Sequence, residues 1–249
     1  MFALAQKAET VKFKAADLER SAVVYRPTKK SENPPVVFVF HGHGGSGRQI
    51  ARSRPIHELW PEAAVIYPNG LTGVKGITDP EGKKTGWQKG PTDVDNRDIL
   101  LFDEMLKWAV KEFNAKPSRT FVTGHSNGSQ FSWLVQAERG DKVAAVAGSC
   151  APGGLWMRNG EKKPAFVIMG TDDPIVNIDG MHRFSDILVK WYGNKKSETR
   201  KDGTVVYEGE GAPIWVWEYD GGHAVPKDTT ERIVEFFKGV LPTTESSSN

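Results

Sequence analysis

The sequence predicts an α/β domain whose mostly parallel central sheet is flanked by helices. Short apolar runs alternate along the chain with longer segments of helical spacing, which is the order that builds such a sheet. The central apolar runs are continuous rather than alternating, as expected of strands covered on both faces. At 249 residues the chain suits one large domain. Strands are expected over residues 22–25, 36–40, 63–67, 120–123, 143–148, 165–169 and 214–219.

Helices are expected between these strands, over residues 98–113, 127–138, 179–191 and 229–238. Right-handed crossovers through them give a single sheet, led by one or two antiparallel N-terminal strands. Residues 68–93 instead carry many glycine, proline, lysine and threonine residues without a convincing period. A loop of this length in a compact domain is usually functional or disordered.

The chain is expected to divide into an N-terminal segment over residues 1–20, a single α/β domain over 21–240 and a disordered tail over 241–249. Residues 3–5 form the Ala-x-Ala pattern of a signal-peptidase site, so the first segment is either a signal-peptide remnant or an ordinary flexible terminus. The first alternative predicts a secreted or periplasmic protein, and the second leaves it cytoplasmic. Cys150 is the only cysteine, so no disulfide can form within the chain.

The composition excludes two classes of partner. With 33 basic and 31 acidic residues the chain has no net field to steer nucleic acid. No apolar run reaches the roughly 18 residues of a membrane span. We therefore expect no nucleic-acid partner and no membrane insertion, and the oligomeric state stays open.

A candidate nucleophile lies in Gly124-His125-Ser126-Asn127-Gly128, which matches G-x-S-x-G between a predicted strand and a predicted helix. In such a strand-to-helix turn the serine hydroxyl is exposed at the helix N-terminus, and the glycines on either side prevent clashes. The alternative is a plain Ser-Asn helix cap. His125 is expected to pack or cap, and not to act as the base.

Two later strands each end in a candidate partner for Ser126. The strand over 165–169 leads to Asp172 and Asp173, and the strand over 214–219 leads to His223. All three side chains therefore lie at the carboxyl edge of a parallel sheet, where ligands bind in open α/β folds. The chain order Ser, Asp, His is that of the α/β-hydrolase fold, so we expect a catalytic triad of this type.

The loop over residues 41–47 follows an apolar strand and predicts an oxyanion hole. An ester carbonyl attacked by Ser126 becomes an oxyanion, which needs two fixed donors, and the candidates are the backbone N–H groups of His43 and Asn127. The loop also has the glycine spacing of a phosphate-binding loop, but Arg48 and Gln49 stand where lysine and serine or threonine are required. A zinc site through His41 and His43 lacks a further ligand cluster, so no metal is expected.

These four segments together resemble the esterase family that includes polyhydroxybutyrate depolymerases, feruloyl esterases and acetyl xylan esterases. The resemblance extends from about residue 21 to residue 238 and rests on residues 42–46, 126–128, 170–176 and 221–223. It implies the α/β-hydrolase fold and a triad acid directly before Pro174, which selects Asp173 and leaves Asp172 as the alternative. It also implies a polymeric or small ester substrate, namely feruloyl or acetyl esters of plant polysaccharide or a polyester.

The chain departs from this family near the catalytic histidine. The usual Gly-Gly-His-x-Trp-Pro reads Gly221-Gly222-His223-Ala224-Val225-Pro226, and disulfides common in extracellular relatives cannot form. Trp87 and Trp156 are candidates for stacking on the substrate. The expected acyl transfer to water needs no cofactor. The alternatives are a catalytically silent binding protein of the same fold and a peptidase on that fold.

Overall fold

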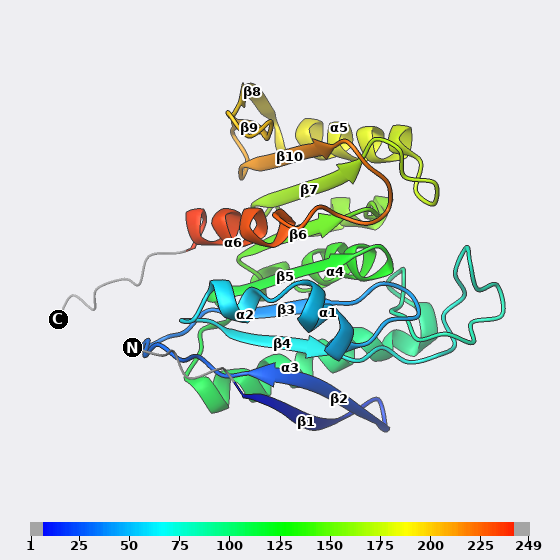
Figure 1. The fold of residues 1–249 in the computed structure, drawn as a ribbon, viewed down its shortest axis with the longest axis vertical. Coiled ribbons are helices and arrows are strands. Elements are labelled where there is room, and N and C mark those ends of the chain that lie inside the picture. The colour runs from blue at the N-terminus through cyan, green and yellow to red at the C-terminus, as the bar shows by residue number, and fades with distance from the viewer. Residues whose placement is uncertain (1–6, 242–249) are drawn as a thin grey trace.

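A ten-stranded sheet runs through the molecule in the order β1-β2-β4-β3-β5-β6-β7-β10-β9-β8 (Figure 1). The structure is a computed structural model and describes residues 7–241. The strands are β1 (Ala8–Ala15), β2 (Leu18–Tyr25), β3 (Val36–Phe40), β4 (Ala64–Pro68), β5 (Thr120–His125), β6 (Ala145–Ser149), β7 (Ala165–Gly170), β8 (Asn194–Thr199), β9 (Val205–Gly209) and β10 (Ile214–Tyr219). The helices are α1 (Gly47–Ser53), α2 (Ile56–Leu59), α3 (Arg97–Phe113), α4 (Asn127–Glu138), α5 (Ile178–Tyr192) and α6 (Thr229–Gly239). Short 3₁₀ turns are η1 (Asp93–Asn96), η2 (Pro117–Arg119), η3 (Gly140–Lys142) and η4 (Leu155–Asn159).

The six strands from β4 to β10 in the middle of the sheet pair in parallel, and the outer strands pair antiparallel. Every residue of β3 is fully buried, which is why this strand reads as a continuous apolar run. The predicted mostly parallel sheet with helices on both faces is confirmed.

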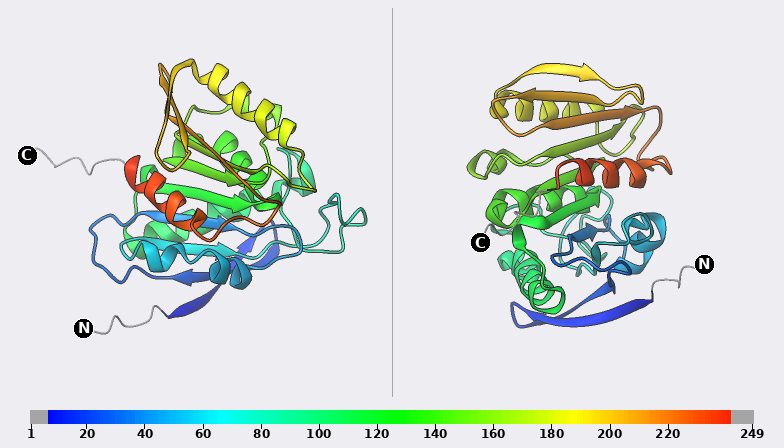
Figure 2. Two further views of the ribbon diagram at one scale, coloured as in Figure 1. Left: turned by 45° about the horizontal axis from the view of Figure 1, so that its top comes forward. Right: turned by 90° about the vertical axis from the view of Figure 1, so that its left-hand side faces the viewer.

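Two hydrophobic cores lie on the two faces of the sheet. One contains apolar side chains of α3, α4 and α5, and the other contains those of α1, α2 and α6. Figures 1 and 2 show these two sets of helices on opposite sides of the strands. The alternation of strand residues between the faces sends Phe38 to the first core and Val37 and Val39 to the second.

The N-terminal boundary drawn from the sequence is wrong, because residues 8–20 belong to the sheet. β1 pairs with β2 along eight residues, from Ala8 opposite Tyr25 to Ala15 opposite Leu18. Phe13 and Ala15 point into the core, while Lys12 and Lys14 at the alternate positions are exposed. The Ala3-Leu4-Ala5 pattern and residues 242–249 of the expected tail lie outside the described residues. Between residues 7 and 241, no helix has the length and apolar character that a membrane crossing requires.

Candidate active site

Ser126 lies in a sharp turn between β5 and α4, at the carboxyl edge of the sheet. Its backbone has a φ of 54°, a left-handed conformation that is strained for a side chain other than glycine. The flanking glycines are required by close approach: a Cβ on Gly124 would lie 2.2 Å from the carbonyl oxygen of Gly128. A Cβ on Gly128 would lie 2.3 Å from the carbonyl oxygen of Phe40. The G-x-S-x-G spacing is therefore a packing requirement of this turn.

The structure brings His223 and Asp173 together at the same edge. Nδ1 of His223 lies 2.7 Å from Oδ2 of Asp173, and the other carboxylate oxygen accepts the backbone N–H groups of Ile175 and Val176 at 2.8 and 2.9 Å. The Asp173 side chain is 3% exposed, so its charge is sheltered and fully hydrogen-bonded. Asp172 is exposed and lies away from the imidazole, so the geometry distinguishes the two aspartates.

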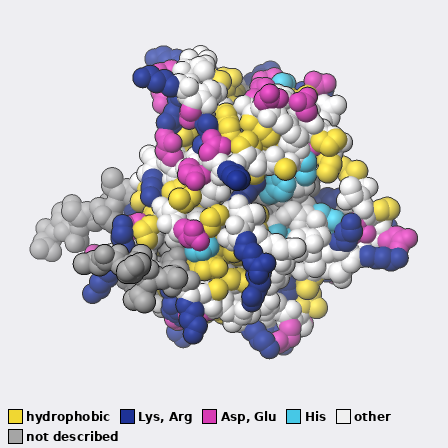
Figure 3. Space-filling view, in the orientation of Figure 1, with side chains coloured by type: hydrophobic (Ala, Val, Ile, Leu, Met, Phe, Trp, Pro, Cys, Tyr) yellow, Lys and Arg dark blue, Asp and Glu magenta, His cyan; other side chains and the backbone are white. Residues whose placement is uncertain are grey.

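Ser126 and His223 line one cavity of about 260 Å³, together with His43 and Asn127. Figure 3 shows histidine side chains gathered on the side of the molecule toward which the parallel strands point. Within residues 7–241 the Ser126 hydroxyl forms no hydrogen bond with the imidazole. Such contacts are often long in substrate-free enzymes and tighten when the reacting complex forms.

Two backbone donors face this cavity. The N–H of Asn127 belongs to the first residue of α4, where helix N–H groups have no partner within the helix. In the loop after β3, Gly44 and Gly45 donate to carbonyl oxygens, whereas the N–H of His43 has no acceptor among the described residues. His43 and Asn127 therefore stay the candidate donors of an oxyanion hole.

Residues 85–87 form hydrogen bonds both with Asn127 and with the loop that contains His43. Thr85 accepts the N–H of Gly44 at 2.7 Å and donates its hydroxyl to the carbonyl of Gly45 at 2.7 Å. Trp87 donates its backbone N–H to the Asn127 side chain at 2.7 Å and accepts from it at 2.9 Å. We call residues 85–87 the clasp. It holds both candidate donor residues from one segment of chain.

The expectation that Trp87 stacks on substrate is wrong, because its side chain is completely buried. The ring stacks on Phe131 with centroids 5.3 Å apart, and its Nε1–H donates to the carbonyl of His41 at 2.9 Å. Trp87 therefore supports the clasp from within the core. Trp156 is half-buried and packs against the core beside η4, and it does not line the cavity that contains Ser126.

His41 is held as a neutral imidazole under the cavity. Its Nδ1 donates to the carbonyl of Gly42 at 2.8 Å, and its Nε2 accepts the N–H of Gly70 at 2.9 Å. Burial lowers the pKa of His41 to about 4. Both ring nitrogens are occupied by these bonds, which argues against the metal site through His41 and His43.

Cys150, Asp173 and His223 form a second group that could in principle hold a metal ion, because their ligand atoms lie within 4.8 Å of one another. Burial raises the pKa of the Cys150 thiol, which disfavours the thiolate that metals bind. The imidazole nitrogen on that side already bonds Asp173. The arrangement fits a hydrogen-bonded Asp173–His223 pair better than a metal centre.

The free energy of unfolding is expected to decrease as the pH is lowered from 6.5 to about 4. Burial lowers the pKa of both His41 and His57 from 6.5 to about 4, so the unfolded chain binds protons at these residues in a range where the folded chain does not. At about pH 4 each histidine has lowered the free energy of unfolding by at most about 3 kcal/mol relative to its value above pH 6.5. Urea denaturation across this range measures the effect.

A His57→Phe variant is the matched test of this pH dependence. Phenylalanine can keep the stacking of His57 on Tyr25, whose ring centroids lie 3.5 Å apart, but it cannot titrate. The variant should therefore show a weaker pH dependence than the parent, and not none, since burial also lowers the pKa of His41 and His125. An unchanged pH profile would contradict the assignment.

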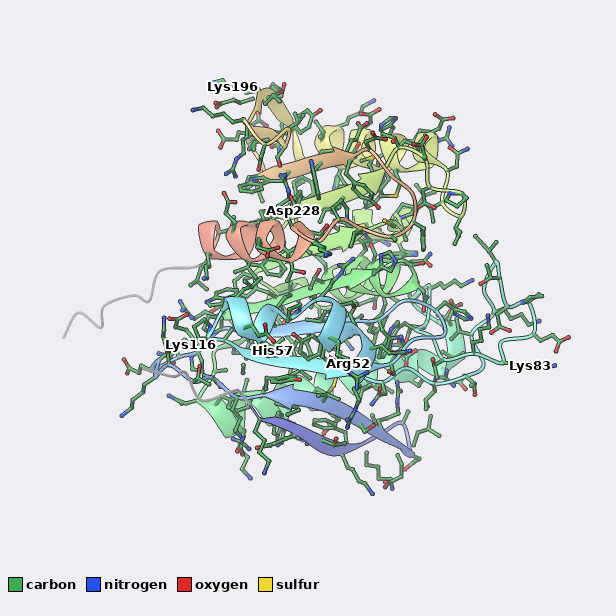
Figure 4. All side chains as sticks on the ribbon, in the orientation of Figure 1. Arg52, His57, Lys83, Lys116, Lys196 and Asp228 are labelled. Atoms are coloured by element: carbon green, nitrogen blue, oxygen red, sulfur yellow. The ribbon has the colours of Figure 1, made fainter. Side chains whose placement is uncertain are left out.

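The long loop over residues 69–92 lies beside the cavity, and hydrogen bonds of Asp79 anchor it. Oδ2 of Asp79 lies 2.9 Å from Nε2 of His43, and its carboxylate accepts the N–H groups of Lys83 and Lys84 at 3.1 and 2.8 Å. These bonds, the one from Lys84 first, lower the pKa of Asp79 to about 2. Figure 4 shows Lys83 at the outer end of the loop. These bonds hold the loop in place, and it brings Ile77 to the cavity with 81% of its surface exposed.

Replacing Asp79 by alanine should free the outer part of this loop. Trypsin cleavage after Lys83 or Lys84 is expected to become about tenfold faster, because local opening exposes the backbone to protease. Glu81→Ala is the control, since Glu81 is an exposed loop residue whose ion pair is with Lys83 at the surface. Equal cleavage rates for the two variants would show that Asp79 does not anchor the loop.

The comparisons with known proteins agree with this architecture. No protein-family model matches the chain. Among solved structures, an acetyl xylan esterase from Aspergillus awamori superposes with a TM-score of 0.72 over 93% of this chain and 99% of that one, at 15% sequence identity. A ferulic acid esterase superposes with a TM-score of 0.69 over 95% of this chain and 99% of that one, at 14% identity. This chain has the α/β-hydrolase fold.

Curated sequence relatives of this chain are named as esterases. It is 24% identical over 172 residues to a bifunctional acetylxylan esterase/xylanase of Neocallimastix patriciarum, which covers 66% of this chain and 23% of the relative. It is 26% identical over 155 residues to acetylxylan esterase A of Aspergillus oryzae, which covers 57% of this chain and 46% of the relative. The matched region is thus less than half of either relative's length. The resemblance to α/β-hydrolase esterases drawn from the motifs is confirmed.

Sequence reasoning missed several residues of the cavity wall. Ile77, Lys89, Gln130, Ile175 and Val176 all line it. Ile175 and Val176 come two and three residues after Asp173, so their position was recoverable from the loop that carries this candidate acid. Ile77 and Lys89 come from the long loop, whose path has no periodic pattern to predict it.

Proposed function

We propose that this α/β-hydrolase is a serine carboxylic-ester hydrolase that works through an acyl-enzyme. The observation that most supports the proposal is the buried Asp173–His223 hydrogen bond beside the strained serine turn, at 2.7 Å. A carboxylate that fixes one imidazole nitrogen leaves the other free to accept a proton from Ser126. Relatives named as esterases support the same reaction class.

In the proposed reaction Ser126 attacks the ester carbonyl while His223 takes its proton. Asp173 fixes the imidazole tautomer and stabilises the imidazolium that forms. The carbonyl oxygen becomes an oxyanion that accepts the N–H groups of His43 and Asn127. His223 then protonates the leaving alcohol, and the same histidine activates the water that cleaves the acyl-enzyme.

The cavity supports an ester with an apolar part and a polar part. Ile77, Ile175 and Val176 contribute apolar surface, and Lys89 and Gln130 contribute polar groups. We propose feruloyl or acetyl esters of plant polysaccharide as the substrates, with hydroxyalkanoate polyesters as the alternative. Because a polymer of this kind meets the enzyme outside the cell, we also propose export, which fractionation of the source cells would test.

Covalent labelling separates this proposal from a catalytically silent binding protein. A fluorophosphonate should form one adduct at Ser126, and peptide mass spectrometry locates it. Prior treatment with the reagent should abolish hydrolysis of nitrophenyl acetate. An unlabelled Ser126 would overturn the serine mechanism.

A substrate panel then addresses the substrate class. Methyl ferulate, acetylated xylan, hydroxybutyrate oligomers and an aryl amide are compared by kcat/KM. The proposal expects esters to exceed the amide by several orders of magnitude and feruloyl or acetyl esters to exceed the oligomers. A preference for the amide would instead indicate the peptidase alternative.

A further inference from the structure

A second apolar cavity lies between η4 and α5, apart from the cavity that contains Ser126. Its volume is about 280 Å³. The α5 wall consists of Gly180, Phe184, Leu188 and Trp191, whose spacing of three or four residues places them on one face of the helix. Leu155 forms part of the opposite wall and is 72% exposed. This helix face is therefore incompletely covered by the chain's own side chains.

Two arginines line the same cavity. Arg158 comes from η4 and Arg183 from α5, and both are exposed. Neither forms an ion pair with any residue that the structure describes, although Asp179 and Asp186 lie within one helical turn of Arg183. This second cavity, which we call the groove, thus combines an apolar floor with two arginines on opposite walls. Neither arginine is neutralised by an acidic side chain among the described residues.

The two cavities are neighbours along two segments of the chain. Ala151 and Val176 line the cavity of Ser126, while Pro152 and Gly180 line the second groove. In each of these two segments, the residue that lines the first cavity and the residue that lines the second are at most four positions apart. The two cavities are therefore lined by neighbouring parts of the same two segments.

We propose that this groove is a binding site for a small aryl carboxylate. The apolar floor, with Phe184 and Trp191, would cover the ring, and Arg158 and Arg183 would neutralise the carboxylate. An uncharged aryl compound would leave both guanidinium groups without a partner, and a simple inorganic anion would leave the apolar floor exposed. This site goes beyond the proposed esterase activity, since occupying it requires no turnover.

Gly180 gives a direct way to fill the groove. A Cβ built on this residue meets nothing within 4 Å, so a larger side chain can be introduced without a backbone clash. Gly180→Phe should occupy the space of the ligand's ring, whereas Gly180→Ala should leave most of it open. Because alanine and phenylalanine both suit a helix better than glycine, neither variant is expected to unfold α5.

Calorimetric titration of the full chain with 3-phenylpropanoate tests the proposal. We expect one-to-one binding that weakens at least about tenfold in Gly180→Phe and less than about threefold in Gly180→Ala. The double variant Arg158→Gln/Arg183→Gln should also bind about tenfold more weakly, with the loss shrinking at high salt. Its control is Arg48→Gln/Arg52→Gln, which removes two exposed arginines from α1 on the opposite face of the sheet.

Three results would overturn the site. They are the absence of binding heat, unchanged affinity in both Gly180→Phe and the arginine double variant, and equal affinity for the uncharged 3-phenylpropanamide. Thermal unfolding of each variant verifies that the fold is intact, and the double variant remains informative if Gly180→Phe fails to fold. Since the titration measures binding alone, its outcome is independent of whether Ser126 hydrolyses esters.

Discussion

Replacing Ser126 by alanine is expected to lower kcat for ester hydrolysis by about 10⁴- to 10⁶-fold. The proposed acyl-enzyme cannot form without the hydroxyl, and the residual rate would come from the oxyanion donors and substrate binding alone. The turn should tolerate the change, since alanine removes only the hydroxyl and leaves the backbone N–H bond to Ser149 at 2.8 Å. Steady-state kinetics with nitrophenyl acetate measure the effect.

Ser53→Ala is the matched control for this experiment. Ser53 is an exposed residue of α1, and its hydroxyl bonds only the carbonyl of Ile50. Its loss should leave kcat within about twofold of the parent. If Ser126→Ala retained activity within about tenfold of the parent, Ser126 would not be the nucleophile.

Replacing Asp173 by asparagine is expected to lower kcat by about 10⁴-fold with little change in KM. The amide oxygen can keep accepting the N–H groups of Ile175 and Val176, which turns the amide NH₂ toward Nδ1 of His223. The imidazole then carries its proton on Nε2 and cannot accept one from Ser126.

Asp172→Asn separates this effect from a general change of the acid loop. Asp172 is the adjacent residue, is exposed and does not contact the imidazole. Its replacement should change kcat by less than about twofold. Comparable losses in the two variants would mean that Asp173 is not the residue that orients His223. The thermal midpoint of each variant, measured in parallel, reports any loss of folding.

The central strands and the candidate triad could be predicted from the sequence because their signals are local. β3 and β10 were expected over the same residues that the structure gives them. β3 is covered on both faces and leaves a continuous apolar run, and β10 is marked by its aromatic and β-branched residues. Ser126 directly follows β5 and His223 comes four residues after the end of β10, so the parallel topology places them at one edge. Choosing Asp173 over Asp172 required either the family motif or the observed contact with His223.

The features that the sequence did not predict depend on long-range packing. β8 is almost entirely exposed and polar at the edge of the sheet, so no apolar pattern marks it. Trp87 was expected at the substrate because it lies in a loop, but its ring fits between Phe40 and Phe131, far away in the sequence. A loop residue can be part of the core when the loop folds back over a helix, and composition does not reveal that.

The clasp also divides the loop over residues 69–92 into a fixed base and an outer part whose sequence is less constrained. The base of the loop is held by a hydrogen bond from Gly70 to His41, by a β-bridge between Leu71 and Gly86, and by a hydrogen bond from Gln88 to the buried Asp98. Residues 72–84 lie outside these fixings, yet they carry Ile77 to the cavity. Apart from Asp79, which bonds His43 at 2.9 Å, the side chains of this stretch could therefore diverge to suit a new ester while His43 and Asn127 keep their positions.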